Sequence, residues 1–132
     1  MAKDYTDKDV HDWNVNDFIA YMDDKHQEYH GLPMAPMRSW SAERGLVGTV
    51  VGTKTKTGKH DKEVVRRFID YTFSNYKPSR QYPTTSFMFM YTYRQQDLIR
   101  IMAEYQQEKK EAEAQAKQSE GIGDEILDWF SS

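Results

Sequence analysis

The sequence predicts an all-α fold, a small bundle of about four helices followed by a flexible C-terminal tail. Three observations favour this fold. Apolar residues recur at helical spacing in four segments, residues that can cap a helix precede each segment, and glycine or proline separates the segments. With 132 residues, of which 38% are hydrophobic and 30% charged, the chain suits one modest core with solvated ends.

The first helix is expected at the start of a helical domain that covers residues 13–105. Residues 1–12 are charged and aperiodic, which predicts a mobile N-terminal arm. The helix is expected to begin at Asn14 or Asn16, since either side chain can cap free backbone N–H groups. Gly31 and the proline two residues later are expected to end it. Its apolar face consists of Val15, Phe18, Ile19, Met22 and Tyr29.

A second helix is expected from Ser39 or Ser41, with a strand as the alternative. Its apolar residues are Leu46, Val47, Val50 and Val51, and its glycines are Gly45, Gly48 and Gly52. Each glycine costs a helix roughly 1 kcal/mol relative to alanine, which weakens the prediction. Glycines spaced three and four apart would also let another helix approach closely, which favours the helix.

The third and fourth helices are expected to begin at Asp61 and at Thr84 or Ser86. The apolar face of the third consists of Val64, Val65, Phe68, Ile69, Phe73 and Tyr76. For residues 87–93 a strand is the alternative, because aromatic residues alternate there. The apolar stripe continues in helical phase beyond Arg94, and this favours one long helix. The aromatic residues of 87–93 could stack on bases if exposed, but at helical spacing they are expected in the core.

Beyond residue 105 the stripe stops, and the sequence predicts an exposed helical or flexible linker over residues 106–123. Gly121 and Gly123 are expected to break that helix. Residues 124–132 then bring an abrupt apolar cluster, which is costly to expose without a partner. A docking peptide is therefore predicted, with a fold-back onto the domain as the alternative. The docking residues are Ile126, Leu127, Asp128, Trp129 and Phe130.

The net charge of −3 conceals a basic centre between two acidic ends. Residues 32–103 carry twelve basic and five acidic residues, whereas residues 1–31 and 104–132 each carry three basic and eight acidic residues. Local fields steer association, so the centre is expected to contact an anion such as nucleic acid, or the chain's own acidic ends. The candidate nucleic-acid-binding residues are Lys54, Lys56, Lys59, Lys62, Arg66 and Arg67. With the flanking helices they would form a helix-turn-helix variant or a wing-like element.

Several chemistries find little support. The chain has no cysteine, which excludes disulfides and thiolate chemistry. A phosphate loop needs four residues between its glycines and Ser or Thr after the lysine, but five separate Gly52 from Gly58 and His60 follows Lys59. No catalytic arrangement is recognisable, so the protein is expected not to be an enzyme and to need no cofactor.

His26 and His30 lie one helical turn apart, with Asp23 one turn earlier, and these three could share a face. The pattern lacks the glutamate of zinc proteases, and two surface histidines are the simpler interpretation, so no metal site is expected. No apolar run is long enough to span a bilayer, and the N-terminus is unlike a signal peptide. A cytoplasmic protein without membrane contact is therefore expected.

The segment Ile126-Leu127-Asp128-Trp129-Phe130 resembles the sliding-clamp-binding peptides of bacterial and phage proteins, which follow a Gln-Leu-Ser/Asp-Leu-Phe pattern. Leu127, Asp128 and Phe130 match, while Ile126 replaces the Gln and Trp129 the Leu. It also resembles the acidic, hydrophobic C-terminal ends of late-transcription coactivators in large tailed phages, small helical proteins that join RNA polymerase to the clamp. The match covers five residues of 132.

Three further runs, RGLVGTVVG, KEVVRRFIDYTFSNYKP and YPTTSFMFMY, are similar to small helical domains from phage replication regions, some of which load helicases. Together the resemblances imply a phage-type adaptor in DNA replication or clamp-dependent late transcription, active in the host cytoplasm. Its tail would bind the sliding clamp or another replisome or transcription protein, and its basic centre DNA or polymerase. A helicase loader or replisome organiser is one alternative, and an inhibitor of a host enzyme is another.

Overall fold

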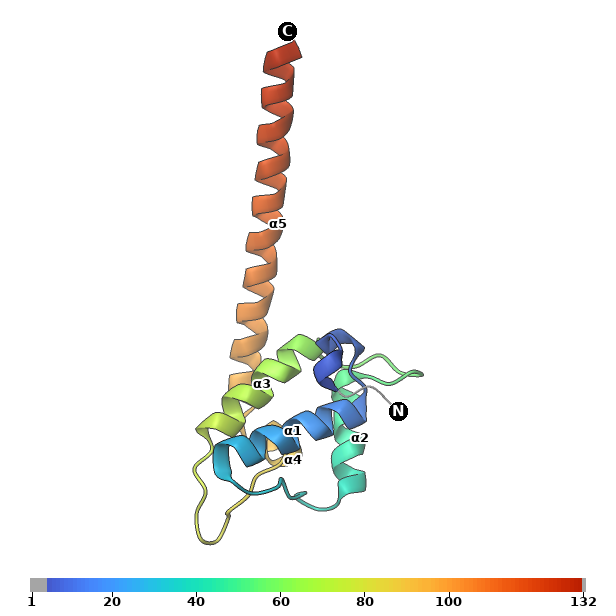
Figure 1. Ribbon diagram of the computed structural model, residues 1–132, viewed down its shortest axis with the longest axis vertical. Helices are drawn as coiled ribbons and strands as arrows, with labels where there is room; N and C mark the ends of the chain where they lie inside the picture. Colours follow the sequence, from blue (N-terminus) through green and yellow to red (C-terminus); the bar gives the residue numbers. More distant parts are fainter. Residues whose placement is uncertain (1–4, 132) are drawn as a thin grey trace. The chain divides into compact units, whose positions relative to one another are not determined.

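The computed structural model describes residues 5–131, with side chains described through residue 117. In this part of the chain the elements are two short 3-10 turns and five α-helices, without a strand, so the predicted all-α class is confirmed (Figure 1). The elements are η1 Tyr5–Asp7, η2 Val10–Asp12, α1 Val15–His30, α2 Trp40–Val51, α3 Lys62–Asn75, α4 Phe87–Tyr93 and α5 Gln95–Ser131. Residues 1–101 form one compact unit and residues 102–132 a second.

Capping residues fix where the first four α-helices begin. Asn14 and Asp17 form a reciprocal capping box, in which each side chain accepts the other's backbone N–H at 2.9 Å. The caps of α2, α3 and α4 are Ser39, Asp61 and Ser86. Gly31 ends α1 in the left-handed conformation, with φ 73°. The predicted helix starts are confirmed, and both segments with a strand alternative are helical.

The core of the first unit is formed by apolar side chains from all five α-helices. Helix α1 packs against both α2 and α3, and α4 packs against α2. The side chains with the least exposed surface are Phe18, Met22, Val47, Val50, Val64, Val65, Phe68, Ile69, Phe73, Phe87, Met90 and Leu98. Burial of each such side chain contributes roughly 1.5–3 kcal/mol, so this cluster is the main source of stability.

Residues 5–12 pack against the domain, in contrast to the mobile arm that the sequence predicted. The ring of Tyr5 lies edge-on to Trp13 and Tyr21, with centroids 5.4 and 5.5 Å away. The indole N–H of Trp13 donates to the Tyr5 carbonyl at 3.1 Å, and Trp13 is only 5% exposed. Aromatic rings on short turns provide this packing, and such contacts leave no periodic pattern in the sequence.

The predicted fourth helix is divided at Arg94, where the backbone leaves helical geometry at φ −122° and ψ 34°. Helix α4 ends there and α5 begins at Gln95. Leu98 and Ile101 at the start of α5 are buried in the same core. The apolar spacing continues across the break, so it could not reveal that one helix had become two.

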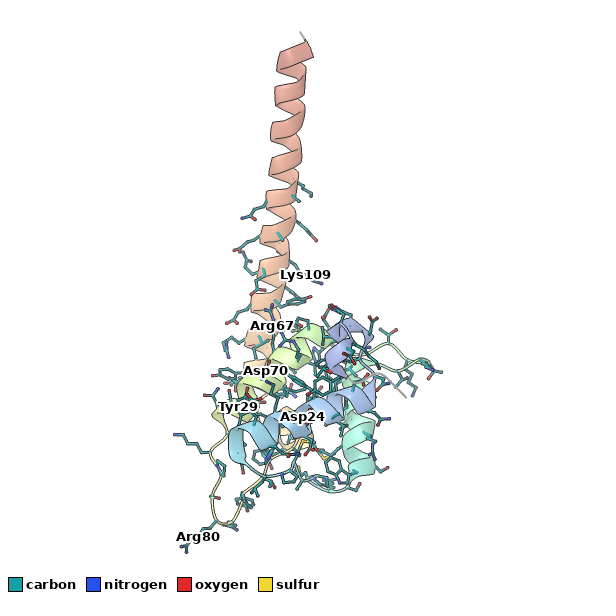
Figure 2. All side chains as sticks on the ribbon, in the orientation of Figure 1. Asp24, Tyr29, Arg67, Asp70, Arg80 and Lys109 are labelled. Atoms are coloured by element: carbon teal, nitrogen blue, oxygen red, sulfur yellow. The ribbon has the colours of Figure 1, made fainter. Side chains whose placement is uncertain are left out.

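The second unit continues α5. Residues 106–117 are exposed, in agreement with the loss of the apolar stripe (Figure 2). The helix runs through Gly121 and Gly123, where the sequence predicted a break. One glycine costs a helix about 1 kcal/mol, a cost that neighbouring strong helix formers can outweigh. The side chains of the predicted docking peptide, residues 126–130, lie outside the described residues.

Candidate nucleic-acid interface

The loop between α2 and α3 folds into a small hairpin, residues 52–60, which we call the basic hairpin. Gly52 and Thr57 face each other in an isolated antiparallel bridge. The backbone N–H of Thr53 donates to the Lys56 carbonyl at 2.8 Å and closes the turn. A helix-turn-helix joins its helices by only three or four residues, so the wing-like alternative describes this loop better.

The hairpin returns to the end of α2 and binds its free carbonyl groups. The N–H groups of Lys59 and His60 donate to the carbonyls of Thr49 and Val50 at 3.3 and 3.0 Å. These acceptors belong to the last turn of the helix, where no helical partner exists. The hairpin therefore completes the hydrogen bonding of α2 and has a defined shape.

Two glycines permit this return. Gly52 adopts φ 94°, a conformation that side-chain-bearing residues rarely take. Gly58 lies directly on the α2 backbone: a Cβ atom added there would be 2.3 Å from the carbonyl carbon of Val51 and 2.5 Å from the nitrogen of Gly52. Backbone atoms cannot rotate away, so only glycine fits.

Replacing Gly58 with alanine is therefore expected to displace the hairpin and lower the free energy of unfolding by about 1–3 kcal/mol. Gly45→Ala is the matched control, because nothing lies within 4 Å of a Cβ there. In the middle of α2 this control should stabilise the protein by up to about 1 kcal/mol. Urea unfolding of both variants measures the effects, and equal stability of the two would contradict the described hairpin.

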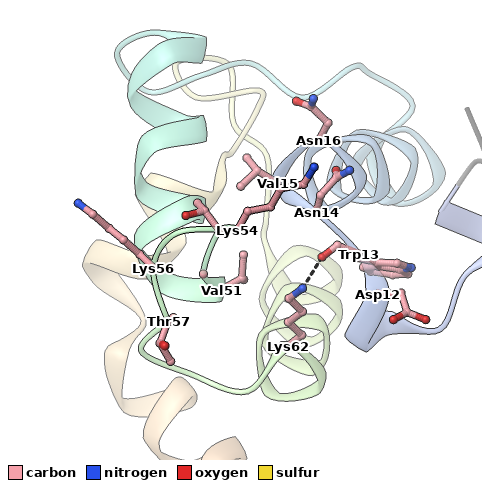
Figure 3. Close-up of a pocket in the computed structure, with 13 residues that line it drawn as sticks. Asp12, Trp13, Asn14, Val15, Asn16, Val51, Lys54, Lys56, Thr57 and Lys62 are labelled. Atoms are coloured by element: carbon pink, nitrogen blue, oxygen red, sulfur yellow. Dashed lines mark hydrogen bonds between the residues drawn. The ribbon is translucent and has the colours of Figure 1, made fainter.

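Three of the six predicted basic residues lie on this hairpin and are exposed: Lys54, Lys56 and Lys59. In Figure 3, Lys56 points away from the neighbouring helices. A hollow of about 730 Å³ separates the hairpin from residues 12–16 at the start of α1 (Figure 3). The acidic side chain of Asp12 also lines this hollow, opposite the lysines of the hairpin.

The other three basic residues already have partners within the domain. The Lys62 ammonium donates to the Trp13 carbonyl at 2.6 Å, which ties the N-terminal turns to α3. On α3, Arg66 forms ion pairs with Glu63 and with Asp70, the latter at 2.9 Å. Arg67 pairs with Glu63 at 3.1 Å.

These ion pairs determine the charge balance on α3. Hydrogen bonds from Arg66 and Arg67 lower the pKa of Glu63 despite its partial burial, and Glu63 in turn raises the pKa of Arg66. Spacings of three and four residues between acid and base were visible in the sequence and signal such pairing. The structure thus divides the predicted basic set into an exposed half and a paired half.

The histidines of α1 hold loops in place, and the prediction of two surface histidines is wrong for His26. His26 is fully buried: its Nδ1 lies 2.6 Å from the Leu32 carbonyl, and its Nε2 accepts the Thr85 N–H at 3.1 Å. His30 Nε2 lies 2.9 Å from the Phe73 carbonyl. Asp23 accepts the Met34 N–H at 2.9 Å. All three side chains therefore contact protein groups, and the described residues contain no cluster of three or more side chains fit to hold a metal.

No family model matches this chain, and comparisons with curated proteins and with solved structures also gave no match. In the described part of the chain, every helix is too short or too polar to cross a membrane.

A second surface was not predicted from the sequence, which favoured a core position for the aromatic residues of 87–93. This surface carries the exposed tyrosines Tyr82 and Tyr93. They are 62% and 63% exposed, more than any other described large hydrophobic side chain. Residues 71–96 contain no Asp or Glu, and this acid-free run was the available signal.

Proposed function

We propose that the chain is a non-enzymatic adaptor that contacts nucleic-acid phosphates through the basic hairpin and a protein partner through residues 126–130. One observation carries the first half: Lys54, Lys56 and Lys59 are exposed on a hairpin that contains no acidic residue. Lysines in such a position bind phosphate by charge without reading base sequence. The resulting affinity is salt-dependent and largely non-specific.

The sliding clamp is the proposed protein partner, on the strength of the resemblance of residues 126–130 to clamp-binding peptides. Aromatic and aliphatic anchors such as Trp129 and Phe130 provide most of the binding energy at small interfaces. A chain that holds DNA weakly at one site and a clamp weakly at another gains avidity by linking the two. This fits a phage-type accessory factor of DNA replication or clamp-dependent late transcription.

DNA binding by the hairpin and clamp binding by residues 126–130 are tested together, with each variant assayed against both partners. The triple variant K54A/K56A/K59A is expected to bind random-sequence duplex DNA at least about tenfold more weakly at low salt. Its slope of log affinity against log salt should fall by as much as ~0.9 for each phosphate that the hairpin no longer binds. The control variant K109A/K110A/K117A removes the same charge from α5. An equal weakening in the control would show that net charge, and not the hairpin, determines DNA binding.

In the same experiment, deletion of residues 124–132 is expected to abolish clamp binding and to leave both DNA affinity and the melting temperature unchanged. Pull-down with purified clamp measures the first effect, and fluorescence anisotropy and thermal melting the others. Clamp binding that survives the deletion, or that is absent in the full chain, contradicts the proposed partner. Recovery of a helicase by the full chain would support the helicase-loader alternative.

A further inference from the structure

A second concave surface lies where two loops meet helix α4. It is lined by residues 35–37 between α1 and α2, by Phe89 and Tyr93 of α4, and by five residues between α3 and α4: Tyr76, Tyr82, Thr84, Thr85 and Ser86. It has a volume of about 380 Å³. We call it the tyrosine groove, after Tyr82 and Tyr93 on its border.

Three aromatic rings of the groove contact one another in sequence, and the ring of Tyr82 is exposed on the same groove. Phe89 lies 4.9 Å from Tyr93 and 6.2 Å from Tyr76, measured between ring centroids. Tyr82, Tyr93 and Met37 are 62%, 63% and 45% exposed. Large apolar side chains gathered in this way mark a binding surface more often than isolated ones do.

The backbone that presents Tyr82 is fixed even though its ring is exposed. The Tyr76 hydroxyl lies 2.6 and 3.0 Å from the carbonyl oxygens of Tyr82 and Thr84, between which its single proton is shared. The Ser79 N–H donates to the Tyr82 carbonyl at 3.1 Å, and the Tyr82 N–H donates to the Ser79 hydroxyl at 3.0 Å. A ring held out on a fixed turn loses little conformational entropy when a ligand covers it.

Positive charge lies on the two loops that contribute to the groove. Arg38, Lys77 and Arg80 lie on its two loops, and none of the three forms an ion pair with a described residue. Figure 2 shows Arg80 at the tip of the loop between α3 and α4. Neither residues 31–42 nor residues 71–96 contain an Asp or Glu, so the charge on these two loops is of one sign. An anionic partner is therefore complementary to this surface.

We propose that the tyrosine groove binds single-stranded nucleic acid, with bases stacked on Tyr82 and Tyr93 and phosphates near Arg38, Lys77 and Arg80. Exposed aromatic rings interleaved with cations are the combination that binds unpaired bases without sequence preference. A duplex keeps its bases stacked inside and cannot use the rings. An acidic peptide would match the charge, but its apolar anchors need pockets that enclose them, whereas these rings are more than half exposed.

This site goes beyond the proposed function, because it uses other loops than the basic hairpin and another form of nucleic acid. The probe is a fluorescein-labelled oligothymidine of roughly 16 nucleotides, titrated with the full-length chain. The double variant Y82A/Y93A is expected to raise the dissociation constant at least about tenfold, since removal of each stacking ring weakens binding severalfold. Y82F/Y93F keeps the rings and should bind like the wild type.

The control pair Y29A/Y71A removes two tyrosines of 37% and 38% exposure that lie outside the groove, and it should leave the affinity unchanged. R80E, at an exposed loop position, is expected to weaken oligothymidine binding without replacing any ring. Unchanged affinity in Y82A/Y93A would overturn the proposal. The proposal would also be overturned if the full chain fails to bind oligothymidine but binds a peptide with the sequence of residues 123–132, and if Y82A/Y93A weakens that peptide binding.

The duplex probe separates this site from the basic hairpin. Y82A/Y93A should weaken only the single-stranded complex, whereas K54A/K56A/K59A should weaken the duplex complex. If the hairpin variant has no effect on duplex DNA while Y82A/Y93A weakens oligothymidine binding, the groove is supported and the hairpin assignment is wrong. Equal weakening of both complexes by Y82A/Y93A would contradict single-strand stacking.

Discussion

Replacing Glu43 with alanine is expected to lower the free energy of unfolding by about 2–4 kcal/mol. Glu43 lies on α2 and is fully buried. Both of its carboxylate oxygens lie 3.2 Å from the backbone N–H of Met88, and Ser86 and Phe87 also hydrogen-bond to it. Truncation removes the acceptor for the first N–H groups of α4 and leaves a cavity behind.

The pH dependence of this effect follows from the pKa of Glu43. Burial raises that pKa above its ordinary value of 4.5, against the opposing effect of its hydrogen bonds. A raised pKa means that the folded state binds the proton more tightly, so the stabilisation by Glu43 is complete below pH 4.5 and declines as the pH rises. Glu43→Gln keeps the shape of the side chain without its charge. Its free energy of unfolding relative to that of the wild type should therefore be higher at pH 7 than at pH 4.5.

Urea unfolding at both pH values measures these differences. Glu28→Ala is the control, because that side chain is 61% exposed on α1 and should change stability by less than about 0.5 kcal/mol. A destabilisation in Glu43→Ala no larger than in this control would contradict the role of Glu43 as the group that holds the start of α4.

Local interactions explain why much of the fold could be predicted from the sequence. The caps Asn14, Ser39, Asp61 and Ser86 act within three residues of their own positions, so the chain around them suffices to place the helix starts. The helical apolar spacing depends on one element at a time, and it correctly favoured a helix over a strand for residues 87–93.

Contacts between distant residues explain what could not be predicted. Nothing around Glu43 distinguishes it from a surface glutamate, and its partner Met88 is 45 residues away. The packing of Tyr5 on Trp13 and Tyr21 uses rings from turns, which have no period. The tyrosine groove likewise forms only when loops far apart in sequence meet, so its exposed rings could not be told from core residues.

The predicted basic site contains both features that could be predicted from the sequence and one that could not. Lys54, Lys56 and Lys59 were predicted to face an anion and are exposed. Lys62 bonds a carbonyl 49 residues away, which the sequence could not show. The pairing of Arg67 with Glu63 four residues before it, however, could have been predicted from spacing alone.

Replacing His26 with alanine is expected to lower the free energy of unfolding by about 2–4 kcal/mol at pH 7.5 and by less at pH 5.5. Leu32 offers His26 only a carbonyl and Thr85 only an N–H, so the ring must be neutral, with its proton on Nδ1. Burial lowers the pKa of His26 below its ordinary value of 6.5, and nearby His30 lowers it further. Its stabilisation is therefore complete above pH 6.5 and is lost as the pH falls.

Two other histidines must be separated from this effect. Burial lowers the pKa of His60 in the same direction, whereas hydrogen bonds to Asp61 and Asp9 raise that of His11 and give it the opposite pH dependence. Comparing wild type with His26→Ala at each pH cancels both contributions, since they are common to the two proteins. The difference in free energy of unfolding between the wild type and His26→Ala should be smaller at pH 5.5 than at pH 7.5. A difference that is the same at both pH values would contradict the neutral, buried ring.

His26 of α1 and Glu43 of α2 act on the same segment, since one holds the N–H of Thr85 and the other that of Met88. This segment also borders the tyrosine groove through Ser86 and Phe89. Protonation of His26, at a pH below its ordinary pKa of 6.5, leaves Nε2 and the Thr85 N–H as two donors facing each other and weakens one of the two attachments. Oligothymidine binding by the wild type is therefore expected to weaken as the pH falls and His26 is protonated, whereas His26→Ala should bind weakly throughout the titration.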